Sequence, residues 1–528
     1  MKTLAQLLLA SLGAGVASAE TKTFCPDYLN YSQVTHEPLS TGKHALSYQR
    51  PIPACRTFNS STVEALIANM SSVVADPDLY RLFENTFPNT LDTAIRWRGH
   101  AANNSAEELA FIITGDINAM WLRDSANQLQ SYLPVLESDP AQIQQPDSIA
   151  SLFRGVINLQ ARYLLTSPFC NSFQPPPESG IPPAVNTNAA SDAVTPAYDP
   201  SAVFECKYEL DSLAAFLQVS TQYYETTHDA AFFAKFQWLP AVQAVLATAR
   251  AMADTGTYGA DGRVLPSPYT FTRQTSRATE TLANDGLGSP VRVTGLVRSA
   301  FRPSDDSTLF QFLVPANMMF ARYLAGAAGI VAKLGSQAPR GLADEMNAFE
   351  RALSAAIAKH GVVPVVSANG SSVETVYAYE VDGYGSANLM DDANVPSLLA
   401  APFFGYLANT DAVYQRTRAR ILSADANPYF MKGSAISAVG GPHVGPGMAW
   451  PMASIVRILT SDDDGEIVAQ LKEILATTDG LGLIHESVNS NNASQWTRPW
   501  FSWANGLFGQ MILDLRFRKP EILKQSFQ

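Results

Sequence analysis

Apolar residues recur along most of this chain at the spacing of an α-helix. Two short stripes of this kind are Ala65, Leu66, Met70, Val73 and Val74, and Leu152, Val156, Leu159, Tyr163 and Leu164. Longer helical patterns, rich in Ala, Leu and Met, predict helices over residues 228–254, 308–334 and 339–359. Further helices are expected near residues 391–406, 410–423, 447–460, 464–477 and 500–516.

Strand patterns are few, so the fold class is all-α with minor β-hairpin insertions. The clearest strand signals, residues 362–366 and 375–379, predict one hairpin. Roughly a dozen helices joined by polar, Gly- and Pro-rich loops favour helical hairpins packed around one core. An (α/α) barrel and an α-solenoid both satisfy this pattern, and periodicity does not choose between them. The chain lacks a recurring repeat of about 20–50 residues, which disfavours the solenoid.

Residues 175–200 differ from their surroundings in being rich in Pro, Ala, Ser, Thr and Asn without periodicity. Such a segment is typical of a domain linker. Helical patterns flank it, however, and Cys170 and Cys206 stand on either side. We therefore interpret it as a long surface loop that borders the active site, within a single catalytic domain over residues 20–528.

Composition narrows the class of partner. Charged residues make up 16% of the 528, below the ~25% usual in soluble domains, and the net charge is −12. Proteins that bind nucleic acids or anionic membranes carry an excess of Lys and Arg. This chain lacks such an excess, so both are excluded as partners. A neutral glycan remains compatible, and we expect a monomer without a cofactor.

The first nineteen residues have the pattern of a signal peptide. Lys2 precedes an apolar run over residues 4–16, and Ala17-Ser18-Ala19 resembles a cleavage site. The apolar run is short for a bilayer span, although an uncleaved anchor is the alternative. The sequence therefore predicts a protein secreted from the cell, or one in the lumen of the secretory pathway or vacuole, without stable membrane insertion.

Cysteines and sequons agree with that compartment. The four cysteines form no C-x-x-C pair, and in an oxidising compartment they suggest two disulfides. Of the three possible connectivities, we favour the local pairs Cys25–Cys55 and Cys170–Cys206. Six N-x-S/T sequons predict glycosylation at Asn30, Asn59, Asn69, Asn103, Asn369 and Asn492.

Common catalytic motifs are missing. His485-Glu486 begins like a zinc-protease motif, but residue 489 is Asn instead of the second His, and no other metal site is expected. The acidic run at 462–465 lacks calcium-loop spacing and is expected to cap the helix after it. No Walker or Rossmann glycine pattern and no G-x-S-x-G elbow is present.

Five clusters of aromatic, basic and acidic residues remain in turn-rich segments, at 114–125, 204–212, 301–306, 440–445 and 485–505. Aromatic rings stack on the apolar face of a sugar, while Arg, Asp and His bind its hydroxyls. Cleavage of a glycoside needs two carboxyl groups, one as acid and one as base or nucleophile. Each cluster alone could merely cap a helix, but five together favour a sugar site.

The second cluster leaves its catalytic carboxylate open. Glu209 and Asp211 flank an apolar stripe on opposite sides, so only one of them can face a shared cavity. Lys207 stands four residues before Asp211 and could pair with it, which would lower the pKa of Asp211. A general acid needs the opposite shift. If Asp211 is the acid, we expect Lys207 to point elsewhere or another negative charge to compensate.

Six motifs together resemble glycoside hydrolase family 125, the exo-acting α-1,6-mannosidases. In chain order they are TGDINAMWLRDS (114–125), KYELDS (207–212), FRPSDD (301–306), GGPHVG (440–445), HES (485–487) and TRPWFSWAN (497–505). The resemblance implies an (α/α)6 barrel, inverting hydrolysis of terminal α-1,6-linked mannose and no metal requirement. Cys206, the Pro-rich loop and the signal peptide depart from the bacterial pattern and suggest a secreted eukaryotic form of fungal type.

Carried over motif by motif, the resemblance makes Asp211 the general acid and Glu486 the general base. Their carboxyl groups are then expected ~6.5–9.5 Å apart, which leaves room for a water. His485 is either an orienting partner of Glu486 or a structural contact. Residues expected to bind the terminal mannose are Trp121, Arg123, Asp124, Arg302, His443, Arg498 and Trp500.

Two other functions stay open. An exo-glycosidase of different sugar or linkage specificity could use the same barrel, because a fold does not fix specificity. A non-catalytic glycan-binding or cell-wall protein could keep the pocket, although retention of both proposed carboxyl groups argues against it. The acidic pI of about 5.1 fits acidic surroundings, and we expect an acidic pH optimum.

Overall fold

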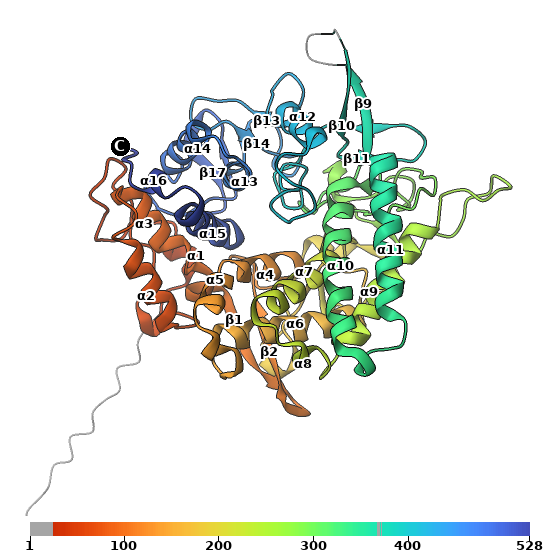
Figure 1. Cartoon of the computed structure of the whole chain (residues 1–528), viewed down its shortest axis with the longest axis horizontal. Coiled ribbons are helices and arrows are strands. Elements are labelled where there is room, and N and C mark those ends of the chain that lie inside the picture. Colours follow the sequence, from red (N-terminus) through yellow and green to blue (C-terminus); the bar gives the residue numbers. More distant parts are fainter. Residues whose placement is uncertain (1–24, 367–369, 371) are drawn as a thin grey trace, which may run out of the picture.

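The computed structural model describes residues 25–366, 370 and 372–528, and these form a mostly helical fold (Figure 1). The predicted signal peptide and the sequon at Asn369 lie outside the described residues. Inner and outer helices alternate along the chain. The inner helices are α4 (Leu122–Gln130), α7 (Leu210–Thr227), α10 (Val314–Leu334), α13 (Pro451–Leu459) and α15 (Ser502–Arg518). The outer helices are α3 (Pro77–Thr86), α6 (Ile149–Thr166), α9 (Trp238–Asp254), α11 (Leu342–Ala356), α12 (Ala412–Ile421) and α14 (Asp464–Ala476).

The inner helices form a ring around the core. Helix α10 packs on α7, α7 on α4, α4 on α15, and α15 on α13. Close approach within this ring depends on small residues. A Cβ placed on Gly326 of α10 would lie 2.4 Å from Thr221 of α7, so only glycine fits there. The arrangement is the (α/α)6 fold expected from the motifs, in which each inner helix is paired with an outer one.

The sixth inner position is taken by a segment of turns between α11 and α12, so the helix predicted at 391–406 is wrong. The Asp391 carboxylate accepts hydrogen bonds from the N–H groups of Leu398 and Leu399 at 2.9 and 3.0 Å. Pro396 removes a further N–H donor. The side chain therefore replaces the backbone carbonyls that a helix would use. Gly405 of this segment lies beside the Arg322 side chain of α10, so the segment packs next to that inner helix.

The other predicted helices are confirmed, with shifted ends. The 228–254 pattern is split into α8 (Ala230–Phe233) and α9, and the 308–334 pattern begins only at Val314, after strand β8 (Phe312–Leu313). Asp463 caps α14 by accepting from the Glu466 N–H at 2.8 Å, as expected for the acidic run. Strand β9 (Val362–Val366) pairs antiparallel with β10 (Val373–Tyr377), which confirms the predicted hairpin.

Short helices and small antiparallel sheets complete the fold. The short helices are α1 (Tyr28–Tyr31), α2 (Ser61–Met70), α5 (Leu133–Ser138) and α16 (Pro520–Leu523). A longer hairpin pairs β1 (Ile95–Ala101) with β2 (Asn104–Ile112) and packs on α6. The remaining strands are β3 (Met120–Trp121), β4 (Ser172–Phe173), β5 (Ala193–Thr195), β6 (Val203–Glu205), β7 (Thr270–Thr272), β11 (Glu380–Val381), β12 (Ala387–Asn388), β13 (Phe430–Met431), β14 (Ala438–Val439), β15 (Met448–Ala449), β16 (Ser487–Asn489) and β17 (Asn492–Thr497).

These sheets bring the sequence clusters together. Sheet β3-β4-β6 joins the segments that carry Trp121 and Glu205, and sheet β15-β16-β17 holds the segment around Glu486. Both favoured disulfides are present, Cys25–Cys55 and Cys170–Cys206. The second closes the base of the Pro-rich segment, next to β6. Among the described helices, none has the length and apolarity needed to span a membrane.

Candidate active site

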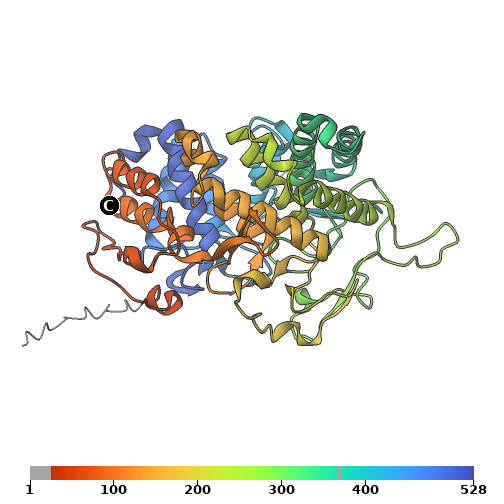
Figure 2. The same ribbon diagram turned by 90° about the horizontal axis from the view of Figure 1, so that it is seen from below.

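The main pocket lies where the inner helices begin. Residues at or just before the first turns of α4, α13 and α15, namely Trp121, Trp450 and Phe501, all line it. Helix N-termini carry partial positive charge, which favours oxygen-rich ligands and carboxylates at this end. The segments between α6 and α7 and between α9 and α10 gather beside the ring of helices (Figure 2). The pocket has a volume of about 370 Å³, the size of a small-ligand site.

Most of the predicted sugar-binding residues meet in this pocket. Trp121, Arg123, Asp124, His443, Arg498 and the predicted base Glu486 all line it. It is also lined by Thr114, Ile117, Val185, Asn186, Thr187, Asn188, Phe204, Glu205, Lys207, Arg273, Glu280, Pro303, Ser304, Asp305, Asn394, Trp450 and Phe501. Within the described residues, no group of three or more His, Cys, Asp and Glu side chains is arranged to hold a metal ion.

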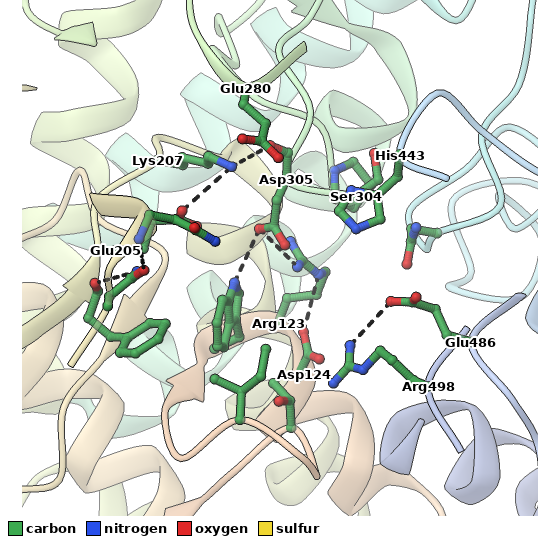
Figure 3. Close-up of a pocket in the computed structure, with 18 of the residues that line it drawn as sticks. Arg123, Asp124, Glu205, Lys207, Glu280, Ser304, Asp305, His443, Glu486 and Arg498 are labelled. Carbon is green, nitrogen blue, oxygen red and sulfur yellow. Dashed lines mark hydrogen bonds and ion pairs between the residues drawn. The ribbon is translucent and has the colours of Figure 1, made fainter. Parts of the chain in front are cut away.

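Arg123 organises the centre of the site (Figure 3). Its Nη1 donates to Glu209 Oε2 at 2.7 Å and to Asp211 Oδ2 at 3.0 Å. Its other nitrogens lie 3.4 Å from Asp124 and 3.7 Å from Asp305. Only 3% of the Arg123 side chain is exposed. The guanidinium is therefore held in one orientation by carboxylates from three separate segments.

Asp211, expected as the general acid, does not lie in the pocket. Its side chain has no exposed surface, and its carboxylate contacts the buried guanidinium of Arg123. Burial raises the pKa of Asp211, while Arg123 opposes that shift. Lys207 does point elsewhere, since its Nζ donates to the Asp305 carbonyl at 2.8 Å. Neither Glu209 nor Asp211 lines the cavity, so both carboxylates serve to hold Arg123.

Asp305 instead presents a carboxylate to the pocket. It stands in a turn with φ of 66°, a conformation that Asp adopts more readily than most residues. Its Oδ1 accepts from Trp121 Nε1 at 3.1 Å and from Asn171 Nδ2 at 3.0 Å, and 24% of its side chain is exposed. Burial raises its pKa, but Arg123 and Lys207 outweigh burial and lower the pKa of Asp305 to about 2. At neutral pH it is therefore ionised.

Glu209 is the protonated partner of Asp305. The Asn171 amide that donates to Asp305 also donates to Glu209 Oε1 at 3.2 Å, so one amide group bridges the two carboxyl groups. Burial raises the pKa of Glu209 well above its usual range, although Arg123 opposes the shift. Two adjacent carboxylates are costly when both are charged, so one of the pair keeps a proton. That proton is held by Glu209, directly behind Asp305.

Glu486 enters the pocket from the opposite side of the site (Figure 3). It immediately precedes β16, and its oxygens accept from Thr497 Oγ1 at 2.9 Å and from Arg498 Nη1 at 3.2 Å. Arg498 also donates from Nε to Asp116 at 2.9 Å, which fixes its guanidinium between two carboxylates. The Glu486 side chain is 8% exposed. Thr497 and Arg498 therefore hold one rotamer of Glu486 toward the cavity.

Asp124 lies between Arg123 and Arg498 and is the most buried carboxylate lining the pocket, with 6% of its side chain exposed. Burial raises the pKa of Asp124 to about 6 against the lowering effect of Arg123. Its place beside two arginines suits hydrogen bonding to sugar hydroxyls.

The histidines of the GGPHVG and HES motifs differ in charge. His443 Nδ1 contacts Asp306 Oδ2 at 3.1 Å, and although burial opposes it, this partner raises the pKa of His443 to about 9. It is therefore an imidazolium beside the pocket at neutral pH. Burial lowers the pKa of His485 to about 4, and its neutral ring stacks on Trp496 at 4.4 Å between centroids. His485 contacts the Arg498 carbonyl at 3.3 Å, so its role is to support that turn.

Two predicted sugar-binding residues lie outside the pocket. Arg302 is buried, donates from Nε to Glu380 at 2.6 Å and packs over the Tyr379 ring, so it holds the 301–306 turn in place. Trp500 packs edge-on against Tyr28 at 4.8 Å and lines a second cavity. Its neighbour Phe501 takes the place in the main pocket that Trp500 was expected to have.

The residues that sequence reasoning did not select come from the same motifs or from loops. Asp305 stands inside the FRPSDD motif. Its turn, with φ of 66°, is visible only in the structure, and this turn directs its side chain into the pocket. Lys207 and Phe204 stand in the second cluster but were not assigned to the site. Val185 to Asn188 carry no motif at all, although the Pro-rich loop was expected to border the site.

Comparisons with known proteins show which family this chain is similar to. A family model described as the metal-independent α-mannosidases (GH125) matches residues 76–513. The chain is 46% identical over 503 residues to the meiotically up-regulated gene 157 protein of Schizosaccharomyces pombe, covering 95% of this chain and 94% of that protein. It also resembles a solved metal-independent α-mannosidase of Streptococcus pneumoniae in a non-productive complex with α-1,6-mannobiose. That likeness has a TM-score of 0.74 and 32% identity, covering 88% of this chain and 100% of the other.

The resemblance expected from the six motifs is thereby confirmed, and the protein is a glycoside hydrolase. The chain belongs to glycoside hydrolase family 125, the metal-independent α-mannosidases.

Proposed function

We propose that the protein is an exo-acting, inverting α-mannosidase that removes terminal α-1,6-linked mannose from glycans. The observation that carries the proposal is a pair of carboxylates, Asp305 and Glu486, that reach one pocket from opposite sides. Charged groups at the first turn of α4 line the same pocket and suit the hydroxyls of a single terminal sugar. The complex of the Streptococcus pneumoniae enzyme with α-1,6-mannobiose supports the linkage.

We assign the general acid to Asp305 and the general base to Glu486. A general acid must come within hydrogen-bonding reach of the glycosidic oxygen. Asp305 has pocket-facing surface, whereas Asp211 has none. In the proposed step, Asp305 gives a proton to the glycosidic oxygen as the C–O bond breaks. Glu486 takes a proton from the water that attacks the opposite face of the anomeric carbon, which inverts its configuration.

Because its low pKa leaves Asp305 ionised, this proton must come from a neighbouring group, and Glu209 supplies it. The Asn171 amide bridges the two carboxyl groups behind the pocket wall. A bound sugar displaces water from Asp305, and desolvation raises the pKa of a carboxyl group. The shared proton then moves to Asp305 without leaving the site. Arg123 contacts both groups and keeps the pair aligned.

Asp124 is the alternative acid, because its pKa of about 6 alone suits that role. The position of Asp124 in the site nevertheless favours Asp305 as the general acid. Asp124 lies at the first turn of α4 with little exposed surface, where it meets the hydroxyls of the terminal sugar. Asp305 is more exposed and lies on the side of the site facing Glu205 and Lys207 (Figure 3), where the leaving group has room.

We also propose that the enzyme works outside the cytosol, on a neutral mannose-containing glycan, as a monomer. Two disulfides and exposed asparagines in five sequons support a secreted or lumenal location. The exposed sequons are Asn30, Asn59, Asn69, Asn103 and Asn492, and glycosylation at them stays a prediction.

The test is hydrolysis of a panel of α-1,2-, α-1,3- and α-1,6-mannobiose. Corresponding α-glucosides serve as alternative substrates that test the specificity for the sugar. Release of mannose from the α-1,6 isomer at a rate at least tenfold above the others is expected. Preference for another linkage or for a glucoside would favour the alternative exo-glycosidase. Binding of mannobiose without turnover would favour a glycan-binding protein.

A further inference from the structure

The outer part of the pocket is built by the Pro-rich loop between α6 and α7. Val185, Asn186, Thr187 and Asn188 line it together with Glu205. Figure 3 places Glu205 and Lys207 on the side of Asp305 that faces away from Glu486. Asn186 Nδ2 donates to the Phe204 carbonyl at 3.0 Å, which puts residues 185–188 beside Glu205. These four residues, here called the loop wall, therefore border the part of the pocket beyond Asp305.

The loop wall is held by several independent contacts. At its start, Gln174 exchanges two hydrogen bonds with the backbone of Ala184, at 2.8 and 2.9 Å. Farther along, β5 pairs with β7, and the Asp192 carboxylate accepts two hydrogen bonds from Arg273, both at 2.7 Å. Although the loop has little regular secondary structure, its position relative to Asp305 is thus fixed. A wall fixed in this way loses little conformational entropy when a ligand binds.

The surface of the loop wall remains available to a ligand. The Val185 side chain is 87% exposed, which offers an apolar patch for the C–H face of a sugar. The exposed side chains of Thr187 and Asn188 make no hydrogen bond to another described residue, so both can bind hydroxyl groups. Arg273 pairs with Asp192 and Glu205, and Lys207 pairs with Glu205. Because these charges are already neutralised, the wall suits a neutral ligand.

The geometry of inversion says which part of the substrate lies there. The base attacks through water from one side of the anomeric carbon, and the acid protonates the leaving oxygen on the other. With Glu486 as base and Asp305 as acid, the leaving group must extend beyond Asp305, away from Glu486. That direction leads to Glu205 (Figure 3), and the loop wall lies beside Glu205 because Asn186 bonds the Phe204 carbonyl.

We propose that residues 185–188 form a binding subsite for the neutral sugar that carries the leaving oxygen. The preferred substrate is then an oligosaccharide whose second sugar contacts this wall, in preference to a mannoside with a small non-sugar leaving group. This inference rests on the proposed assignment of Asp305 and Glu486, because that assignment sets the direction of the substrate.

The test compares two substrates that share the terminal mannose, α-1,6-mannobiose and 4-nitrophenyl α-mannoside, in the double variant Thr187→Ala/Asn188→Ala. The ratio of kcat/KM for mannobiose to kcat/KM for the aryl mannoside should fall about tenfold, the effect of losing one to two hydrogen bonds. Thr195→Ala is the matched control, since Thr195 is an exposed threonine of the same loop outside the pocket. It should leave the ratio unchanged.

A binding measurement separates this inference from the proposed function. In Glu486→Gln, calorimetry compares the Kd of mannose with that of α-1,6-mannobiose, with and without the loop-wall substitutions. Tighter binding of the disaccharide, lost with the substitutions, supports the subsite even if the wild type fails to cleave mannobiose. An unchanged ratio in both the kinetic and the binding experiment would overturn it. An equal fall for both kinetic substrates would overturn it as well, because the wall would then not act on the second sugar.

Discussion

Replacing Asp305 and Asp211 separately by Asn distinguishes a carboxyl group that donates a proton from one that supports the site. Asp305 is 24% exposed, lies 3.7 Å from Arg123 and accepts from two neutral donors, so its loss should cost about 1–1.5 kcal/mol of unfolding free energy. Asp211 is fully buried and bonds Arg123, so its loss should cost about 2 kcal/mol. Glu209 remains bonded to Arg123 in that variant, which keeps the cost below the ~3–5 kcal/mol of a buried pair fully broken.

Activity should show the reverse order. Loss of a general acid typically slows a reaction about 10²–10⁴-fold. Asp305→Asn should lose activity to this extent on α-1,6-mannobiose, whose sugar leaving group needs a proton. On 2,4-dinitrophenyl α-mannoside, whose leaving group needs none, the loss should be less than about tenfold. Asp211→Asn should lower the activity on both substrates equally, because it only makes the Arg123 side chain less rigid.

The assay is steady-state kinetics on both substrates, with urea unfolding of each variant as the control for stability. A loss of the same size on both substrates in Asp305→Asn would refute its assignment as the acid. A loss confined to mannobiose in Asp211→Asn would restore the assignment made from the motif, and the same pattern in Asp124→Asn would move the acid to that residue.

Three further outcomes are expected. Glu209→Gln keeps a hydrogen-bond donor beside Asp305 but cannot release a proton, so kcat on mannobiose should fall at least about tenfold while the dinitrophenyl substrate is affected less; equal effects would argue against a shared proton. The pKa of His443 is raised in the folded state to about 9, so its stabilising effect is complete below its unfolded pKa of about 6.5 and is lost as pH rises through 9. The Tm difference between wild type and His443→Gln should therefore be larger at pH 6 than at pH 9.5, and a constant difference would contradict this. Arg302→Met leaves Glu380 buried without its cation and should cost ~3–5 kcal/mol in urea unfolding; a raised KM in a fully stable variant would instead return Arg302 to the sugar site.

Helical periodicity predicted most of the barrel because each inner and outer helix buries an apolar stripe of its own. It failed at residues 391–406, where the pattern is equally apolar. There the Asp391 carboxylate accepts from backbone N–H groups that a helix would bond internally. Pro396 has no backbone N–H to donate. Such a side-chain capture depends on the folded position of one residue and leaves no trace in the spacing of apolar positions.

The pocket was predicted in outline, since most of the chosen aromatic and charged residues do meet. The placement of Asp211 away from the pocket has a long-range cause. Asp211 is enclosed by Arg123, which lies 88 residues earlier in the chain, and Asp305 reaches the pocket through a left-handed turn. Arg302 and Trp500 stand in the right motifs, but each supports the residue beside it. A motif locates a site, whereas the tertiary contacts decide which of its side chains face the substrate.

The most direct test of the account is proton NMR of the anomeric signals during hydrolysis of α-1,6-mannobiose by the wild type, beside Glu486→Gln and Asp305→Asn. The account predicts that β-mannose appears first and equilibrates later to the α-anomer, and that both variants release mannose at least about 100-fold more slowly. Initial release of α-mannose would contradict inversion, and undiminished turnover in either variant would contradict the two-carboxylate assignment.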